Sequence, residues 1–291
     1  GHGAEQVRSV LGDQAEYVLQ QPQLGTGHAV MQAEPILSVK TDLVLVTYAD
    51  MPLLTSETLS KLVELAQSHS DPISMLTVSA DEPRGFGRIL RDTTGRVVGI
   101  VEEAQATPEQ LNIRELNPGV YCFRADWLWP ALKRIQLSPK GEYYLTDLVG
   151  LAVSDRYLVH TLAVENPDEV IGINTRVHLA QAEGLLRQRI NTRWMLAGVT
   201  MIDPAQTYIE PEVTIGQDTI LWPGTYLHGT THIGEACVIG PNTMIRDTEV
   251  GDHCTILASV LEYAVLEDHV GMGPYCHLRK GAHLSHEVHM G

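Results

Sequence analysis

The last third of the chain carries a six-residue repeat, and this period restricts the possible folds more than any other feature. Aliphatic residues recur six positions apart, without a break, at Ile209, Ile215, Leu221, Leu227, Ile233, Ile239 and Ile245. Four positions after each of the first six stands a small or β-branched residue: Val213, Thr219, Thr225, Thr231, Cys237 and Thr243. An α-helix needs a period of 3.6 and a flat strand a period of 2, whereas a period of six is typical of a parallel β-helix. We therefore predict coils in which one apolar side chain per six residues points inward and stacks on the next coil.

The repeat slips near Val250 and Ile256 and then resumes with Leu266, Met272, Leu278, Leu284 and Met290. The sequence stops inside this repeat, and it opens on a glycine instead of a methionine. Each coil of a β-helix needs neighbours to bury its apolar face. We therefore expect the chain to be a piece of a longer protein, cut at both ends.

The first 170 residues alternate short apolar runs with helical patterns. Residues 43–48 are β-branched and almost wholly apolar, which is typical of a strand covered on both faces. Further strands are expected at 72–79 and 116–123, helices at 56–67 and 124–133, and a hairpin at 88–101. Strands separated by helices favour an α/β domain with a mainly parallel, Rossmann-like sheet.

A long helical pattern from Asn174 to about Leu196 separates these two regions, and Asn174 is a candidate N-cap. The expected organisation is an α/β domain over residues 1–173, a linker helix over 174–198 and the start of a β-helix over 199–291.

Composition excludes several classes of partner. The chain has 291 residues and a formal net charge of −16, which argues against a nucleic-acid partner because duplex binding relies on Lys and Arg. There is no apolar run of 18 residues and no signal peptide, so we expect a cytoplasmic protein without a membrane partner. The four cysteines form no C-x-x-C pair and are expected to be small buried hydrophobes.

Two short segments have the composition of a phosphate or metal site. Around Gln20 and Gln23, a loop with Gly25, Thr26 and Gly27 precedes a helical run. Glycines let backbone N–H groups approach a ligand, and glutamine suits the edge of a base, although a tight turn needs the same residues. Asp50 directly follows the apolar strand, where it is a candidate Mg²⁺ ligand or a turn residue.

A third set of polar residues suits the hydroxyl groups of a sugar. It comprises the segment from Gly85 to Arg88, the pair Glu102 and Glu103, Asn117, and the segment from Gly141 to Asp147. Carboxylates accept hydrogen bonds and amides both donate and accept them, so together they match alternating hydroxyls. Taken separately, each of these residues is also compatible with ordinary surface polarity.

The order of the motifs resembles one family along essentially the whole chain. The matching segments are Gly1-His2-Gly3, Gln20 to Ala29, Tyr48 to Pro52, Gly85 to Ile89, Ile100 to Glu102, Glu115 to Gly119, Gly141 to Asp147, Gly172 to Arg176 and Leu196 to Pro204. The chain is similar to the bifunctional bacterial N-acetylglucosamine-1-phosphate uridylyltransferase and glucosamine-1-phosphate acetyltransferase. This family supplies UDP-N-acetylglucosamine for peptidoglycan and lipopolysaccharide synthesis.

The resemblance implies a role for each candidate residue. Gln20, Gln23, Gly25 and Thr26 would contact the nucleotide, while Asp50 and Asn174 would hold catalytic Mg²⁺ against the phosphates. Tyr48, Gly87, Glu102 and Asn117 would bind the sugar. The reaction would be attack of N-acetylglucosamine 1-phosphate on the α-phosphorus of UTP, which yields UDP-N-acetylglucosamine and pyrophosphate.

The resemblance also implies a left-handed β-helix and a homotrimer when the protein is full length. Arg279 matches an arginine that binds the sugar phosphate in the acetyl-transfer site, where acetyl-CoA is the co-substrate. The family's glycine-rich loop that wraps the triphosphate has no counterpart in this sequence, and we expect little or no uridylyltransferase activity from the chain alone. Ala49 and Pro118 depart from the family pattern, in which glycine and Thr or Ser are usual.

Two alternatives remain open. One is a related monofunctional nucleotidyltransferase that uses another sugar phosphate or nucleotide. The other is a non-catalytic scaffold protein built on a degenerate nucleotidyltransferase domain, although the presence of both Asp50 and Asn174 argues against it.

Overall fold

The computed structural model describes residues 3–80 and 85–291, and the chain divides into two compact units. The first ends at Asn174 and the second begins at Thr175, at the start of the predicted linker helix. Gly1 and His2, which belong to the first family motif, lie outside the described residues.

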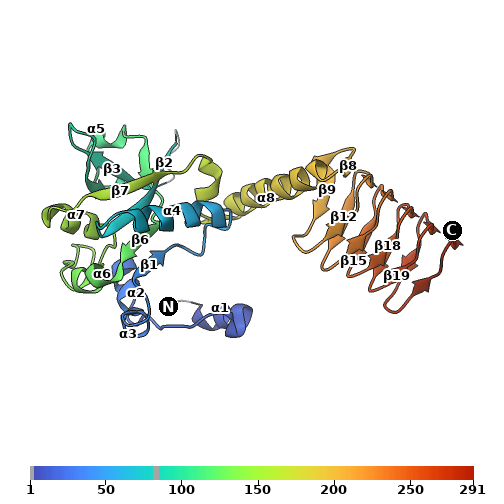
Figure 1. The fold of residues 1–291 in the computed structure, drawn as a ribbon, viewed down its shortest axis with the longest axis horizontal. Helices are drawn as coiled ribbons and strands as arrows, with labels where there is room; N and C mark the ends of the chain where they lie inside the picture. Colours follow the sequence, from blue (N-terminus) through green and yellow to red (C-terminus); the bar gives the residue numbers. More distant parts are fainter. Residues whose placement is uncertain (1–2, 81–84) are drawn as a thin grey trace. The chain divides into compact units, whose positions relative to one another are not determined.

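The described part of the first unit alternates helices and strands (Figure 1). In chain order the elements are α1 (Ala4–Leu11), η1 (Gly12–Gln14), α2 (Gly25–Met31), α3 (Glu34–Leu37), β1 (Leu43–Val46), α4 (Ser56–Ser68), β2 (Ile73–Ser79), β3 (Gly87–Arg91), β4 (Val97–Val101), η2 (Glu103–Gln105), α5 (Pro108–Leu111), β5 (Glu115–Asn117), β6 (Tyr121–Arg124), α6 (Ala125–Leu132), α7 (Asp147–Ser154), β7 (Val159–Ala163) and η3 (Pro167–Val170).

The strands form one sheet in the order β1-β6-β2-β5-β3-β4, and β7 also pairs with β2. The α/β class is confirmed, but the expectation of mainly parallel pairing is wrong. Among the described strands of this sheet, only β2 and β7 run parallel, whereas the other pairings within it are antiparallel. In addition, β1 lies at one end of this order and, within the described part of the chain, pairs with β6 alone, so its apolar sequence does not place it in the middle of the sheet.

Apolar side chains cover both faces of this sheet. One core joins α6 and α7 to the sheet through residues such as Leu128, Leu132 and Leu148. The other core joins α4 to the sheet through Leu62 and Ala66. The side chain of Thr55 caps α4 by accepting a hydrogen bond from the Thr58 backbone N–H, 3.2 Å away. The sheet is therefore held rigidly between helices, and its edges and connecting loops can carry polar side chains.

The predicted single strand over 116–123 is divided by a turn into β5 and β6. Gly119 lies in this turn with a φ angle of +82°, in the left-handed region that glycine adopts without a Cβ clash. The hairpin predicted over 88–101 is present as β3 and β4, joined by the turn at Asp92.

The second unit begins with the long helix α8 (Arg176–Leu196). Its N-cap is Thr175, one residue beyond the predicted Asn174, and the Thr175 hydroxyl accepts a hydrogen bond from the His178 backbone N–H at 3.2 Å. Asn191 of α8 donates hydrogen bonds to the carbonyl oxygens of Pro204 and Thr207, at 2.8 and 3.0 Å. These contacts fix the C-terminal half of α8 to the first coil that follows it.

The remaining elements form a parallel β-solenoid consistent with the expected left-handed β-helix. They are β8 (Thr200–Met201), η4 (Pro204–Gln206), β9 (Thr207–Ile209), β10 (Thr214–Ile215), β11 (Ile220–Leu221), β12 (Thr225–His228), β13 (His232–Ile233), β14 (Val238–Ile239), β15 (Met244–Arg246), β16 (Glu249–Val250), β17 (Thr255–Ile256), β18 (Val260–Glu262), β19 (Val265–Leu266), β20 (Gly271–Met272), β21 (His277–Leu278), β22 (His283–Leu284) and β23 (His289–Met290). Every third strand pairs in parallel, which produces three sheets of five, six and five strands among the described residues.

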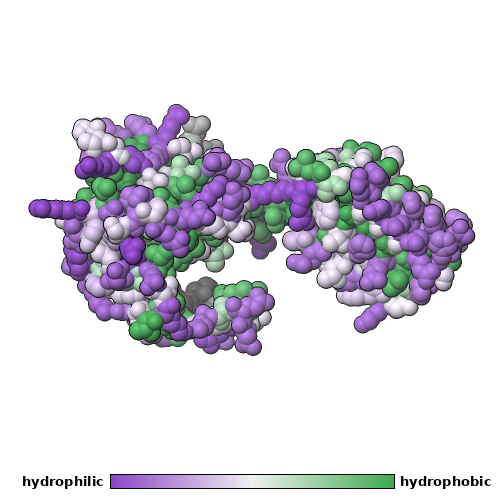
Figure 2. All heavy atoms as spheres, in the orientation of Figure 1, coloured by the Kyte–Doolittle hydropathy of each residue, from purple (hydrophilic) through white to green (hydrophobic). Residues whose placement is uncertain are grey.

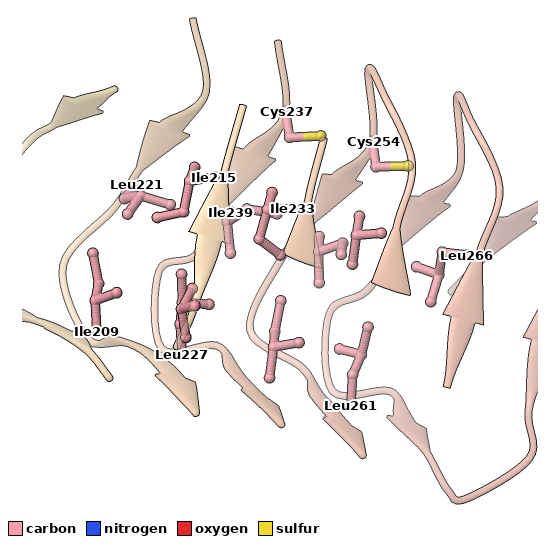
Figure 3. Packing of buried hydrophobic residues seen from close by; sticks show 14 of the residues in the cluster. Ile209, Ile215, Leu221, Leu227, Ile233, Cys237, Ile239, Cys254, Leu261 and Leu266 are labelled. Atoms are coloured by element: carbon pink, nitrogen blue, oxygen red, sulfur yellow. The ribbon is translucent and has the colours of Figure 1, made fainter. Parts of the chain in front are cut away.

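The six-residue repeat supplies the core of this solenoid, as predicted. Leu227 pairs with Ile209 on one side and with Ile245 on the other, and all three side chains are buried. Figure 3 shows these aliphatic side chains pointing into the coil, with Cys237 and Cys254 at equivalent positions of successive coils. The expectation of buried cysteines is confirmed for Cys122, Cys237 and Cys254, whereas Cys276 is half-buried.

Coil length varies along the solenoid, which explains the slip in the repeat. Ile215 pairs with Ile233, eighteen residues later, but Ile233 pairs with Val250, only seventeen residues later. Val250 then pairs with Leu266, sixteen residues later. The residues lost lie in the corners between strands, so the inward-pointing positions stay aligned.

The described helices include none that is long and apolar enough to cross a bilayer. On the face of the second unit seen in Figure 2, hydrophobic surface gathers near the first coils and hydrophilic surface toward the last ones.

Candidate active site

The glycine-rich loop of the sequence forms the start of α2 and packs against the segment around Tyr143. The Gly27 backbone N–H donates to the carbonyl oxygen of Tyr143, and the Tyr143 N–H donates to the carbonyl oxygen of Leu24, both at 2.8 Å. A Cβ atom at Gly25 would lie 2.8 Å from the Tyr143 carbonyl oxygen, and Gly25 has a φ angle of +91°. Glycine is therefore needed at this position for close backbone packing.

Gln20 and Thr26 are tied to this loop by side-chain hydrogen bonds. The Gln20 amide donates to the Gly25 carbonyl oxygen at 2.9 Å and lies 3.2 Å from Nδ1 of His28. The Thr26 hydroxyl accepts a hydrogen bond from the Leu145 backbone N–H at 3.1 Å. The loop of residues 20–26 is thus attached to residues 143–145, more than a hundred positions later in the chain.

The two predicted metal ligands, Asp50 and Asn174, come together around Gly172. A Cβ atom placed on Gly172 would lie 3.6 Å from Oδ2 of Asp50 and 3.8 Å from the amide nitrogen of Asn174. The backbone N–H of Ile173 also donates to the Asp50 carbonyl oxygen at 2.8 Å. Both side chains are exposed, so a carboxylate and an amide are accessible side by side. A carboxylate and a side-chain amide, whose oxygen is also a metal ligand, form a donor set compatible with Mg²⁺, which takes its remaining ligands from water and phosphates.

Tyr48 lies over the turn between β5 and β6. A Cβ atom at Gly119 would clash with the ring, since Cε2 of Tyr48 would be only 2.2 Å away. Partial burial raises the pKa of the Tyr48 hydroxyl, and the nearby carboxylates of Glu102 and Asp50 raise it further, while a hydrogen bond with Thr26 lowers it. Tyr48 therefore lies among the loop of α2, the Glu102 carboxylate and the Asp50 side chain.

The three sugar-site candidates other than Tyr48 lie on neighbouring strands or directly after one. Gly87 on β3 pairs with Asn117 on β5, and Glu102 directly follows β4, which pairs with β3. A Cβ atom at Gly87 would lie 3.7 Å from Oε2 of Glu102. The buried Asn117 amide donates to the Tyr121 hydroxyl at 2.7 Å, and its oxygen accepts the Gly119 N–H at 3.0 Å. These contacts fix the orientation of the Asn117 side chain.

Glu102 also contacts the segment from Gly141 to Asp147. The Thr146 hydroxyl donates to Oε1 of Glu102 at 2.9 Å. Partial burial raises the pKa of Asp147, and the negative charge of Glu102 raises it further. Two neighbouring carboxylates can accept hydrogen bonds from several sugar hydroxyls at once.

Sequence reasoning missed Gly119 and Gly172 as functional candidates, and it named Thr146 only as part of the segment from Gly141 to Asp147. Gly119 and Gly172 appeared only as members of the family motifs. Whether a position requires glycine depends on the atoms around its Cβ position, and here the nearest of these belong to residues that are remote in sequence. The hydrogen bond from the Thr146 hydroxyl to Glu102 was not predictable, because the two residues lie 44 positions apart in the sequence. The Pro118 side chain is buried beside Gly119, and Ala49 is exposed beside Asp50.

Two predicted residues are not brought into this set by any described contact. Gln23 is exposed at the end of the loop that precedes α2. Arg279 belongs to the second unit, where it is exposed in the turn after β21.

Comparisons with known proteins agree with the motif order. The model of the nucleotidyl transferase family matches residues 4–192. The bifunctional protein GlmU of Exiguobacterium sibiricum is 46% identical over 100% of this chain and 65% of its own length. The proteins of the same name from Geobacillus sp. (strain WCH70) and Caldanaerobacter subterraneus subsp. tengcongensis are 44% and 45% identical, over 100% and 96% of this chain and 64% and 61% of their own lengths.

The chain thus spans less than two thirds of the length of these curated relatives. The family match, together with the glycine-rich loop, the Asp50–Asn174 pair and the polar residues beside β3, identifies the chain as a member of the nucleotidyl transferase family, similar over its whole length to the proteins named GlmU.

Proposed function

We propose that the first unit is the catalytic domain of a uridylyltransferase, which transfers UMP from UTP to N-acetylglucosamine 1-phosphate. The observation that carries the proposal is the convergence of Asp50 and Asn174 around Gly172, next to Tyr48 and Glu102 along the same surface. The products would be UDP-N-acetylglucosamine and pyrophosphate, and these substrates place the proposed reaction in the cytoplasm.

Each group of residues has a proposed task. Gln20, Gln23, Gly25 and Thr26 bind the nucleotide, because the loop before α2 offers amides and closely packed backbone. Tyr48, Gly87, Glu102 and Asn117 bind the N-acetylglucosamine moiety. The resulting alignment of the sugar phosphate with the α-phosphorus lowers the barrier by positioning.

Asp50 and Asn174 would hold Mg²⁺ in this proposal. When bound, the metal ion neutralises phosphate charge in a phosphoryl transfer, and this is the chemistry that the other groups do not supply. The Ile173 N–H holds the Asp50 backbone next to Gly172, and the Asp50 carboxylate lies near the Cα of Gly172. Gly172 leaves the space between the two side chains open.

The proposed metal role is tested by calorimetry with UDP-N-acetylglucosamine, with and without Mg²⁺, on the chain and its Asp50→Ala variant. We expect Asp50→Ala to weaken the Mg²⁺-dependent affinity on the order of tenfold or more, as loss of a metal-site partner commonly does. Asp42→Ala is the matched control, because Asp42 is exposed just before β1 and its backbone carbonyl oxygen still accepts from Ala125.

The outcomes separate the alternatives. Binding that ignores both Mg²⁺ and the Asp50 substitution would count against the metal role. Absence of any nucleotide–sugar binding would favour the scaffold hypothesis, and tighter binding of another sugar nucleotide would favour the monofunctional alternative. Low turnover by the isolated chain stays a prediction, which an assay of pyrophosphate release can test.

Arg279 belongs to a separate proposal for the second unit. Its exposed guanidinium would bind a sugar phosphate in an acetyl-transfer site that uses acetyl-CoA, and such a site would depend on the expected homotrimer. Analytical ultracentrifugation of the full-length protein, for which the homotrimer is expected, tests the trimer directly.

A further inference from the structure

Arg88 is a buried charged residue in the first unit for which the proposed reaction has no use. The residue is 1% exposed, and it lies on β3 between Val101 of β4 and Leu116 of β5. One guanidinium nitrogen, Nη2, donates to Oε2 of Glu103 at 3.1 Å, and the other, Nη1, donates to the carbonyl oxygen of Phe86. Its Nε atom is buried without a hydrogen-bond partner among the described residues.

An ion pair whose guanidinium is buried needs an explanation other than stability, even though the Glu103 side chain is partly exposed. Removing a guanidinium from water is costly, and apolar residues of similar volume often stabilise a protein as well as a buried ion pair does. Such pairs are retained in some proteins because they select one arrangement of the chain. The partner of Arg88 therefore indicates which part of the chain is being held.

That partner is the residue directly after Glu102. Glu103 is the first residue of the short helix η2. The backbone N–H of Gln105, the last residue of η2, donates to the Glu102 carbonyl oxygen at 2.9 Å. On its other side, the Glu102 carboxylate accepts a hydrogen bond from Thr146 at 2.9 Å. An ion pair at Glu103 thus fixes the backbone from which the Glu102 side chain extends.

We propose that Arg88 is a positioning residue for sugar recognition. By holding Glu103 against β3, it sets the direction in which the Glu102 carboxylate faces the sugar of a bound nucleotide sugar. This inference rests on the proposed function, since it needs Glu102 to bind the sugar, but it assigns a role to a residue that does not itself touch the substrate.

The same strand provides a matched control. Arg91, three residues after Arg88, forms an ion pair with Glu115 at 2.5 Å and is partly exposed. This pair also links β3 to a neighbouring strand, but Glu115 lies at the far end of β5 from Asn117. Loss of Arg91 therefore removes a cation and an ion pair from β3 without touching the turn at η2.

The first experiment compares affinities for UDP-N-acetylglucosamine and for UDP, which lacks the sugar. We expect Arg88→Met and Glu103→Gln to weaken binding of UDP-N-acetylglucosamine on the order of tenfold, because a misplaced contact group costs that much or more. UDP affinity should be unchanged in both variants, Arg88→Lys should recover part of the loss, and Arg91→Met should behave like the unmodified chain. Equal weakening for both ligands, or no weakening for either, would overturn the proposal.

The second experiment needs no ligand and keeps the two hypotheses apart. Hydrogen exchange should become faster at the amides of Gln105 and Ala106 in Arg88→Met and Glu103→Gln, and stay unchanged in Arg91→Met. Unchanged exchange in all variants would overturn the positioning role. The unmodified chain can also bind UDP and UDP-N-acetylglucosamine equally well. In that case, faster exchange in the variants would support the restraint of η2 by Arg88 but refute the role of Glu102 in sugar binding. If Arg88→Met does not fold, the Glu103→Gln variant tests the positioning role by itself. The Glu103 side chain is 42% exposed, so this substitution disturbs the core less, and it leaves the Arg88 guanidinium in place.

Discussion

At the proposed sugar site, one added carbon atom would displace a side chain. The contact between Tyr48 and Gly119 is the clearest example. The ring occupies the position that any Cβ at Gly119 would need. Gly119 also has a positive φ angle, so two independent constraints select glycine at this point. The Tyr48 hydroxyl forms a hydrogen bond with Thr26 and lies near the carboxylates of Glu102 and Asp50. A displacement of its ring would therefore affect both the proposed nucleotide-binding residues and the proposed sugar-binding residues.

Gly119→Ala should therefore cost more than backbone strain alone. We compare it with Gly95→Ala, because Gly95 has a similar φ angle of +84° but nothing within 4 Å of its Cβ position. Strain should destabilise Gly95→Ala by about 1–2 kcal/mol. Gly119→Ala should lose roughly 1–3 kcal/mol more, because the inserted methyl overpacks against the ring. Chemical denaturation measures both values, and equal losses would contradict the clash with Tyr48.

Residue types predicted some of this site and missed the rest, for a physical reason. Asp50, Glu102 and Asn117 were candidates by residue type, but their roles were implied only by the resemblance of the motif order, because a single carboxylate or amide is also compatible with ordinary surface polarity. Arg88 was named only as one member of the polar set, and its burial was not predictable, since arginine on a strand is ordinarily exposed and nothing local in the sequence shows that it is buried. The proposed role depends on its ion pair with Glu103, which is fifteen positions away in the sequence. The two residues come together because β3 pairs with β4.

At the scale of elements, periodicity was a reliable guide and strand direction was not. The six-residue repeat reports directly which side chains face inward, because that period is a local property of each coil. Direction depends on how the chain returns to the sheet, and here β1, β5 and β6 pair antiparallel to their neighbours although helices separate several of the strands. The apolar sequence of β1 was likewise compatible with a central or a terminal position in the sheet.

Neighbouring coils are also joined by polar contacts, and Glu210 provides a test of one such link. Its carboxylate accepts a hydrogen bond from the Gly229 backbone N–H at 2.6 Å and lies 2.9 Å from Nδ1 of His228. The Gly229 N–H and then His228 lower the pKa of Glu210 below its usual 4.5. A lowered pKa in the folded state stabilises the fold above the unfolded value, and this contribution is lost as the pH falls through the folded pKa.

Glu210→Gln should therefore lower the unfolding temperature at neutral pH and make little difference well below pH 4.5. The effect should be at most about 1 kcal/mol, because half of the Glu210 side chain is exposed to solvent. Thermal unfolding at a series of pH values measures it, with Glu212→Gln as a control on the same exposed turn. A difference that persists unchanged at acid pH would show that the carboxylate charge is not involved.

The whole molecule consists of two units with separate apolar cores. The cores on the two faces of the sheet contain only residues of the first unit, and the solenoid core contains only residues from Ile190 onward. The change from irregular to six-residue spacing revealed this organisation in the sequence, because each architecture imposes its own period. The last residue of the first unit was less predictable, since Asn174 and Thr175 are both good helix caps.

Separate cores imply separable unfolding. We expect two transitions in calorimetry, and Leu266→Ala should shift only one of them, by about 2–5 kcal/mol of unfolding free energy for that unit. Leu266 is 2% exposed on β19, whereas its neighbour Val265 is 40% exposed and provides the control Val265→Ala. Gly119→Ala should shift the other transition. A single transition that responds to both substitutions would mean that the units unfold together.

The unequal coils of the solenoid have a consequence for how such a sequence can change over time. Coils of sixteen, seventeen and eighteen residues coexist here with the same inward alignment. A deletion of one residue in a corner is therefore compatible with an intact sheet, whereas the same deletion inside a two-residue strand would turn an apolar side chain toward solvent. Gaps in alignments of related solenoids should accordingly gather at the corners, and a strictly periodic search pattern would overlook homologues that have lost residues there.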